Sequence, residues 1–187
     1  SGTDEFVLNE DGNLEAEGHV WYRITNEYTS PRTLMEVTET DFPEGNFSRN
    51  TSFLGNKKLR RKDVEQVTFL SSLDGKTDDA WDVSEDQDGT VFAWVDRSEK
   101  DCHVYIAADG GVLANRYSNN LFRYCINLKS VDFNESFYTD SVYTAGYMFA
   151  ECRSLTELDI PDFAENEITF MKKMFYNGDI ITMENTK

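Results

Sequence analysis

Hydrophobic positions in the C-terminal part of the chain recur with a fixed period. Leu121-Phe122 is followed 27 residues later by Met148-Phe149, and 26 residues after that by Met174-Phe175. Other positions match at the same spacing: Cys125 with Cys152, Leu128 with Leu155, Asp132 with Asp159, and Val142 with Ile168. A period in the twenties is typical of a solenoid, in which each unit buries its apolar face against its neighbours. The pattern therefore predicts stacked repeats, with the rings of Phe122, Phe149 and Phe175 in one interior column.

Each unit also contains the pattern L-x-x-L-x-L of a leucine-rich repeat, over residues 128–133 and 155–160. Side chains of a strand alternate between its two faces, so Val131 and Phe133 are expected to point inward and Asp132 outward. The second half of each unit is expected to return as a short helical or irregular segment. The pattern predicts a short solenoid of about two and a half coils.

The third copy of the repeat is degenerate. Ile181 still matches Leu155, but Glu184 and Thr186 stand where inward-facing apolar residues are expected. Two explanations stay open at this point. The copy is either a polar terminal cap, which solenoids require, or the start of an array that continues beyond this chain.

The residues before the repeats read as a β-rich region. Apolar runs separated by the turn signals Asp74-Gly75, Asp88-Gly89 and Asp109-Gly110 predict antiparallel strands between residues 63 and 115. We expect this segment to shield the first coil of the solenoid from water. Further upstream, the alternation in residues 19–24 predicts one more strand.

These patterns define a fold class and a domain organisation. The fold class is β-rich (α+β): a short leucine-rich-repeat-type solenoid preceded by an antiparallel β-rich cap. The predicted parts are an N-terminal β or irregular region at 1–62, a β-rich capping segment at 63–115, and leucine-rich repeats at 116–187. The individual repeats are expected at about residues 122–148, 149–174 and 175–187.

Charge excludes several classes of partner. The net charge is −17 and the isoelectric point is about 4.4, so phosphate backbones and anionic membrane surfaces repel the chain as a whole. No run of about 18 apolar residues occurs, so no segment is expected to insert into a bilayer. The oligomeric state is not predicted by these features.

The only basic run covers residues 57–62, with the sequence KKLRRK. One interpretation is a docking patch for an acidic partner. The other is a solvated segment that balances acidic neighbours within the same chain. The acidic balance of the whole chain favours the second interpretation.

The sequence contains little that indicates catalysis. Cys102 and His103 are a thiol and a base, but adjacent residues of a strand face opposite sides and cannot form a dyad. Neither a metalloprotease, a serine-hydrolase, a phosphate-loop nor a dinucleotide-binding motif occurs. Cys125 and Cys152 are expected to be two buried thiols in neighbouring coils, because parallel stacking does not turn them toward each other.

An acidic cluster precedes the apolar run at residues 91–95 and has enough carboxylates to be considered as a calcium site. Its members are Asp78, Asp79, Asp82, Glu85, Asp86 and Asp88. With Gly89 at the sixth position of a calcium loop, Val95 falls at the twelfth, where a carboxylate is needed. We therefore predict a hairpin turn there, and no metal or other cofactor.

The remaining candidate site is a surface. In a leucine-rich solenoid, the outward side chains of the strands form one continuous face, which is the usual recognition surface. The predicted binding residues on and beside this face are Lys129, Ser130, Asp132, Thr156, Glu157 and Asp159. The alternative is that these residues are only solvated strand positions.

Several segments resemble a known family. Residues 80–95 and 105–112 are similar to its leader segment, and residues 127–133 and 148–159 to its repeats. The family is the BspA-like leucine-rich repeats, the 26-residue repeats of bacterial surface proteins. The resemblance covers about residues 63–187 and implies a secreted or surface location, with the signal peptide already removed, and a role in adhesion or host recognition of a protein or glycan. It supplies no catalytic residues.

Two other functions remain open beside adhesion. The chain could be a structural spacer or capping module of a larger surface protein, which would bind no ligand of its own. It could also be a carbohydrate-active enzyme, which would need a pocket holding a pair of carboxylates.

Overall fold

A computed structural model describes residues 30–38, 47–96, 100–159, 173–178 and 182–184 of the chain. Within these ranges the fold consists of short strands and the 3₁₀ turn η3 (Arg61–Asp63), which confirms the β-rich class. The strand predicted at residues 19–24 lies outside the described residues. No helix in the described ranges is long and apolar enough to cross a bilayer.

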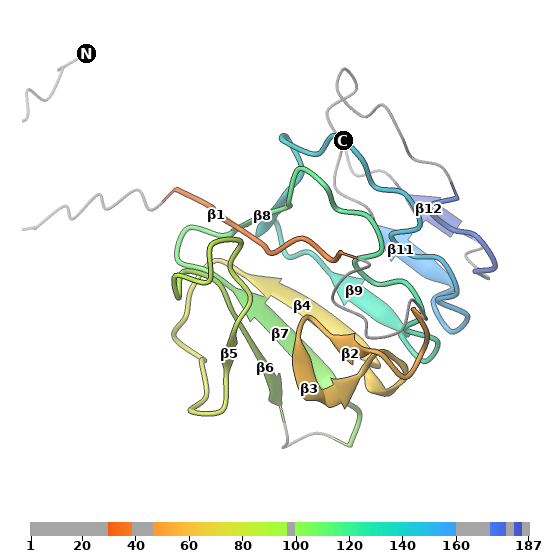
Figure 1. Cartoon of the computed structure of the whole chain (residues 1–187), viewed down its shortest axis with the longest axis horizontal. Coiled ribbons are helices and arrows are strands. Elements are labelled where there is room, and N and C mark those ends of the chain that lie inside the picture. The colour runs from red at the N-terminus through yellow and green to blue at the C-terminus, as the bar shows by residue number, and fades with distance from the viewer. Residues whose placement is uncertain (1–29, 39–46, 97–99, 160–172, 179–181, 185–187) are drawn as a thin grey trace, which may run out of the picture.

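The strands form four sheets (Figure 1). In chain order the strands are β1 (Arg32–Thr33), β2 (Ser52–Phe53), β3 (Asn56–Arg60), β4 (Gln66–Leu70), β5 (Trp81–Asp82), β6 (Phe92–Asp96), β7 (His103–Ala107), β8 (Val112–Leu113), β9 (Ser130–Asp132), β10 (Phe137–Tyr138), β11 (Glu157–Asp159) and β12 (Thr182–Glu184). The small sheets are the parallel trio β1-β8-β10, the antiparallel hairpin β2-β3 and the parallel pair β11-β12.

The largest sheet has the order β5-β6-β7-β4-β9. The antiparallel arrangement expected between residues 63 and 115 is confirmed for β5, β6 and β7 and is wrong for β4, which runs parallel to both β7 and β9. The physical reason is the connection after β4. Residues 71–80 lead away from β4 to the far edge of the sheet, and β6 and β7 then return toward it. This crossover brings β7 alongside β4 in the same direction.

One face of this sheet forms the core. Val67 of β4 is level with Val104 of β7 and Val131 of β9, and all three are buried. The row on the opposite face includes Asp132, which is exposed. The predicted alternation of buried Val131 and exposed Asp132 is therefore confirmed.

The backbone repeats itself over the predicted units. The Phe122 amide donates to the Met148 carbonyl at 2.8 Å, and the Phe149 amide donates to the Met174 carbonyl at the same distance. Left-handed φ angles recur at the same two places in each unit: Asn120 (62°), Tyr147 (57°) and Lys173 (57°), then Tyr124 (64°), Glu151 (63°) and Asn177 (54°). Non-glycine residues adopt this conformation rarely, so its recurrence marks equivalent backbone positions.

Aromatic rings stack along these units. The Phe122 and Phe149 centroids are 5.1 Å apart with an interplanar angle of 17°, and the Phe149 and Phe175 centroids are 5.7 Å apart at 11°. The predicted column of three rings is confirmed. Phe53 of β2 adds a fourth ring, 6.3 Å from Phe122. The hairpin β2-β3 thus packs against Phe122, a contact that the sequence pattern did not indicate.

Candidate functional site

The predicted strand face is open to solvent in both described repeats. In β9 and β11 the central residues Val131 and Leu158 are buried, whereas the residues on either side of them are exposed. All six predicted binding residues are exposed: Lys129, Ser130, Asp132, Thr156, Glu157 and Asp159. β9 and β11, which carry or adjoin these residues, lie next to each other in Figure 1.

Lys129 is exposed and forms ion pairs with two carboxylates. Its Nζ lies 2.6 Å from an oxygen of Glu65 and 2.8 Å from an oxygen of Asp101. Hydrogen bonds to Asp101 and Glu65 raise the pKa of Lys129, and the bond from Lys129 lowers the pKa of the Asp101 carboxyl. Lys129 therefore joins β9 to the start of β4 and to the loop before β7.

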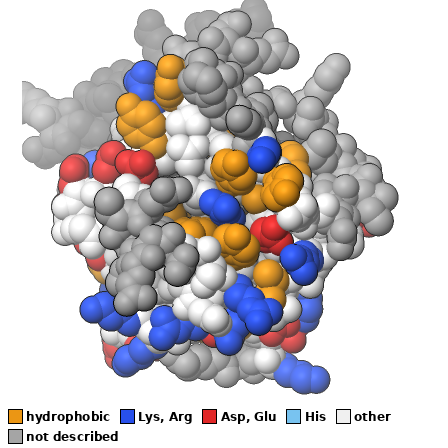
Figure 2. Space-filling view, turned by 45° about the vertical axis from the view of Figure 1, so that its right-hand side comes forward, with side chains coloured by type: hydrophobic (Ala, Val, Ile, Leu, Met, Phe, Trp, Pro, Cys, Tyr) orange, Lys and Arg blue, Asp and Glu red, His pale blue; other side chains and the backbone are white. Residues whose placement is uncertain are grey.

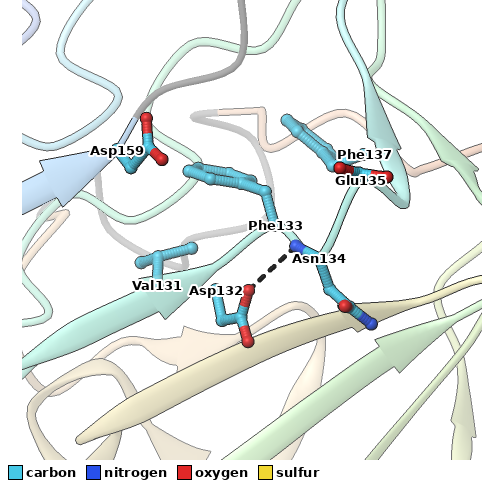
Figure 3. Close-up of a pocket in the computed structure, with 7 residues that line it drawn as sticks. All are labelled: Val131, Asp132, Phe133, Asn134, Glu135, Phe137 and Asp159. Carbon is cyan, nitrogen blue, oxygen red and sulfur yellow. Dashed lines mark hydrogen bonds between the residues drawn. The ribbon is translucent and has the colours of Figure 1, made fainter. Parts of the chain in front are cut away.

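A pocket of about 490 Å³ opens at the end of this face (Figure 3). Its lining combines three carboxylates with apolar side chains: Val131, Asp132, Phe133, Asn134, Glu135, Phe137 and Asp159. Asp132 and Asp159 occupy equivalent positions in consecutive repeats. The structure thus brings these two predicted residues together in one pocket, whereas Lys129, Ser130, Thr156 and Glu157 lie outside its lining.

A tight turn shapes one wall of the pocket. Asn134 and Glu135 have φ angles of 46° and 49°, and the Ser136 amide donates to the Phe133 carbonyl at 2.8 Å. Two left-handed residues closed by this bond make a type I′ turn. The Asp132 carboxylate accepts the Asn134 amide at 2.9 Å, as the dashed line in Figure 3 marks. Asp132 therefore both faces the pocket and fixes the turn.

Sequence reasoning missed Phe133, Asn134, Glu135 and Phe137 as pocket residues. Phe133 was expected only as an interior residue; it and Phe137 are largely buried and still line the pocket. The turn contains no glycine, the residue that usually indicates left-handed φ angles in a sequence. The one available signal was the sequence Asp-Phe-Asn, because Asn tolerates left-handed φ angles and Asp can accept a backbone amide two residues later.

The acidic loop before β6 is held by its own hydrogen bonds. One Asp82 oxygen accepts the Ser84 amide and hydroxyl, and the other accepts the Gly89 amide at 2.8 Å. The Thr90 hydroxyl donates to Asp88 and lowers the pKa of that carboxyl. Among the described residues, no group of three or more His, Cys, Asp or Glu side chains is arranged to hold a metal ion. The loop joins antiparallel β5 and β6, as the predicted hairpin requires.

All three cysteines lie within the described ranges and remain thiols. Cys125 and Cys152 are both buried, as predicted, and burial raises the pKa of Cys125 to about 12 and the pKa of Cys152 well above its usual value. Cys102 is half-buried, and the His103 ring bonds through Nε2 with the Thr68 hydroxyl at 2.9 Å.

The basic run contains a buried cation, which corrects the expectation of a solvated segment. Arg61 is 1% exposed. Its Nη1 donates to the carbonyls of Asn120, Leu121 and Arg123 at 3.1, 2.9 and 3.0 Å. Its guanidinium lies 4.6 Å from the Phe47 ring centroid, and burial lowers its pKa.

Three backbone carbonyls and an aromatic face replace water around the Arg61 charge, which explains how a cation is tolerated at this depth. The exposed residues of the run, including Lys57, Lys58 and Arg60, remain solvated as expected.

Comparisons with protein-family models, with curated proteins and with solved structures give no match for this chain.

Proposed function

We propose that this chain is a non-enzymatic recognition module, built as a short leucine-rich-repeat-type solenoid and exported to or displayed on a bacterial cell surface. Support for the solenoid comes from the recurring hydrogen bonds, the recurring left-handed residues and the stacked rings. Support for the location comes from the resemblance of residues 63–187 to the BspA-like repeats.

The main support for a binding role is that Asp132 and Asp159 line the same pocket. In a stacked array, equivalent outward residues of adjacent strands come to lie side by side. Solvation alone does not require two carboxylates to share a hollow with phenylalanine rings. A concave site with an apolar floor and a few convergent polar groups is the usual form of a ligand site.

The chemistry of the lining indicates the kind of ligand. Carboxylates accept hydrogen bonds from hydroxyl or ammonium groups, and the small exposed parts of Val131, Phe133 and Phe137 add apolar contact. A sugar ring or a polar side chain of a partner protein carries both features. The proposed ligand is therefore a glycan or a protein segment that presents hydroxyl or ammonium donors beside an apolar surface.

The test is binding to glycan and host-matrix arrays, followed by titration of the strongest ligand. Asp132→Asn/Asp159→Asn removes both charges, while the new side-chain amide oxygen at position 132 can still accept the Asn134 amide and preserve the turn. We expect affinity to fall by about tenfold or more, since hydrogen bonds to charged groups contribute about 1.5–3 kcal/mol. Glu157→Gln, on β11 but outside the pocket lining, is the matched control and is expected to bind like the wild type.

Three other results of this test would contradict the proposed pocket or the proposed function. An equal loss in Glu157→Gln would move the site from the pocket to the wider strand face. Absence of binding to every array member would favour a spacer or capping module. Release of sugar from any glycan by the wild type, abolished in the double variant, would overturn the non-enzymatic assignment, because paired carboxylates are the usual catalytic groups of glycosidases.

A further inference from the structure

The hairpin β2-β3 and its flanks concentrate positive charge in an acidic protein. Residues 47–62 include six lysines and arginines and no aspartate or glutamate, although the whole chain has 35 acidic residues and a net charge of −17. Buried Arg61 fixes this segment onto the first repeat through three backbone carbonyls. The other five cations stay at the surface: Arg49, Lys57, Lys58 and Arg60 are exposed and Lys62 is half-buried.

The charges of this basic hairpin, residues 47–62, form no ion pair within the described part of the chain. There, ion pairs join Lys129 to Glu65 and Asp101, and Arg153 to Glu151. None of them involves the basic hairpin. Figure 2 shows lysine and arginine side chains gathered along the lower part of one face. Within the described part of the chain, no ion pair therefore neutralises the cluster.

We propose that the basic hairpin binds an anionic glycan, a polysaccharide carrying sulfate or carboxylate groups. Short lysine- and arginine-rich runs are typical of patches that bind nucleic acid or heparin-like chains. Lys58 and Arg60 share one face of β3, on the other side from buried Leu59, and together with the neighbouring exposed cations they can contact several charges of an extended polymer. An exported or displayed protein would meet anionic glycans rather than other anionic polymers. The choice of a glycan as the ligand therefore rests on the proposed function.

The rings beside the hairpin favour a glycan over a single-stranded nucleic acid. Nucleic-acid sites of this kind need open aromatic faces on which bases stack. Here the Arg61 guanidinium lies 4.6 Å from the Phe47 ring centroid and 5.8 Å from that of Phe53, and the Arg123 guanidinium lies 5.3 Å from that of Phe47. The protein's own cations thus lie against the Phe47 and Phe53 rings, so neither ring is an open platform for a base.

The net charge of the chain does not prevent this interaction at physiological salt. Charges are screened beyond about 8 Å at an ionic strength of about 0.15 M. A glycan on the hairpin therefore experiences mainly the nearby cations, while the acidic residues elsewhere act only when salt is very low.

The experiment measures binding of the whole chain to immobilised heparin at about 0.15 M salt. Lys57→Gln/Lys58→Gln/Arg60→Gln removes three exposed cations and is expected to weaken binding by about tenfold or more, with a shallower dependence on salt. The control is Arg32→Gln/Lys76→Gln/Arg116→Gln, which changes the net charge equally at exposed positions outside the hairpin. It is expected to retain wild-type affinity.

Three outcomes would overturn the proposal: no retention of the wild type on heparin, an equal loss in both triple variants, or tighter binding to single-stranded DNA than to heparin. Thermal melting of both triple variants checks that they are folded. Asp132→Asn/Asp159→Asn keeps the hairpin intact and is expected to bind heparin as the wild type does. Failure of the pocket as a binding site and failure of the basic hairpin are therefore separately observable.

Discussion

Arg61 Nη1 donates to the Leu121 carbonyl at 2.9 Å, across 60 residues of sequence. This bond joins the hairpin β2-β3 to the first repeat, and the carbonyls of Asn120 and Arg123 share the same guanidinium nitrogen. No carboxylate forms an ion pair with Arg61 in the described part of the chain. The hairpin is thus attached by a buried cation that donates to backbone carbonyls.

The first prediction concerns that attachment. Arg61→Ala should lower the free energy of unfolding by about 3–5 kcal/mol, because it removes a donor shared by three backbone carbonyls, of which that of Asn120 keeps the Arg123 amide, and because it opens a cavity. Arg61→Lys should recover little, since one ammonium lacks the planar fork of the guanidinium. Urea denaturation measures the change. Arg60→Ala, at the exposed neighbouring position, should stay within about 0.5 kcal/mol of the wild type, and a similar loss in both variants would contradict the anchoring role.

The second prediction concerns the column of rings. Phe149 is fully buried between Phe122 and Phe175, so Phe149→Ala should cost about 3–5 kcal/mol of unfolding free energy. Phe175 is only partly buried, and Phe175→Ala should cost clearly less. Chemical denaturation of the two variants compares the costs directly. An equal loss would mean that Phe175 is as enclosed as Phe149.

The third prediction separates stability from binding at the pocket. Glu135 has a φ of 49°, which disfavours residues with a side chain, so Glu135→Gly should stabilise the protein by about 0.5–1 kcal/mol. Glu135→Gln keeps the unfavourable φ and should leave stability unchanged. Both variants lose the carboxylate and should weaken ligand binding alike. Thermal melting and titration of the ligand found on the arrays measure the two effects, and a destabilised glycine variant would contradict the turn geometry.

The fourth prediction concerns pH. Burial raises the pKa of Cys125 to about 12 and also raises the pKa of Cys152. Above pH 9 the unfolded chain therefore loses thiol protons that the folded protein still holds. Their contribution to stability is complete below the ordinary thiol pKa of 9.0 and is lost as the pH rises above it. The Cys125 thiol should lower the free energy of unfolding by at most about 1.4 kcal/mol per pH unit between pH 9.0 and about 12, and Cys152 acts in the same direction.

Other groups also titrate above pH 9, so the thiol contribution is measured as a difference. The wild type and Cys125→Ala/Cys152→Ala are unfolded by urea at pH 8 and pH 10. The wild type should lose more stability over this interval than the double variant does. Parallel pH dependences in the two proteins would show that the buried thiols do not contribute.

The sequence predicted features that depend on periodic burial. The column of rings, the buried thiols and the alternation around Val131 all follow from apolar positions repeated at a fixed spacing. The outward position of Asp132 and Asp159 followed from the same alternation. Local pattern was sufficient because these positions recur at a fixed spacing, and the equivalent rings of Phe122, Phe149 and Phe175 pack on one another.

The remaining features depend on partners that leave no pattern in the sequence. Arg61 lies in a run of exposed cations and is buried because its partners are backbone carbonyls, which any residue supplies. The turn at Asn134 and Glu135 is held in a left-handed conformation without a glycine to signal it. The parallel pairing of β4 with β7 depends on the path of the crossover, and strand propensity does not encode that path.

The position of β4 between β7 and β9 also bears on how the chain unfolds. Arrays of repeats often lose their units one at a time from an end, because each unit contacts only its neighbours. Here Val67 of β4 is level with both Val104 and Val131, so the first repeat shares a hydrogen-bonded ladder with the larger sheet. Melting of β9 therefore leaves one edge of β4 unpaired. The described sheet and first repeat should unfold together in one transition, and their pairing across long loops should make refolding slow.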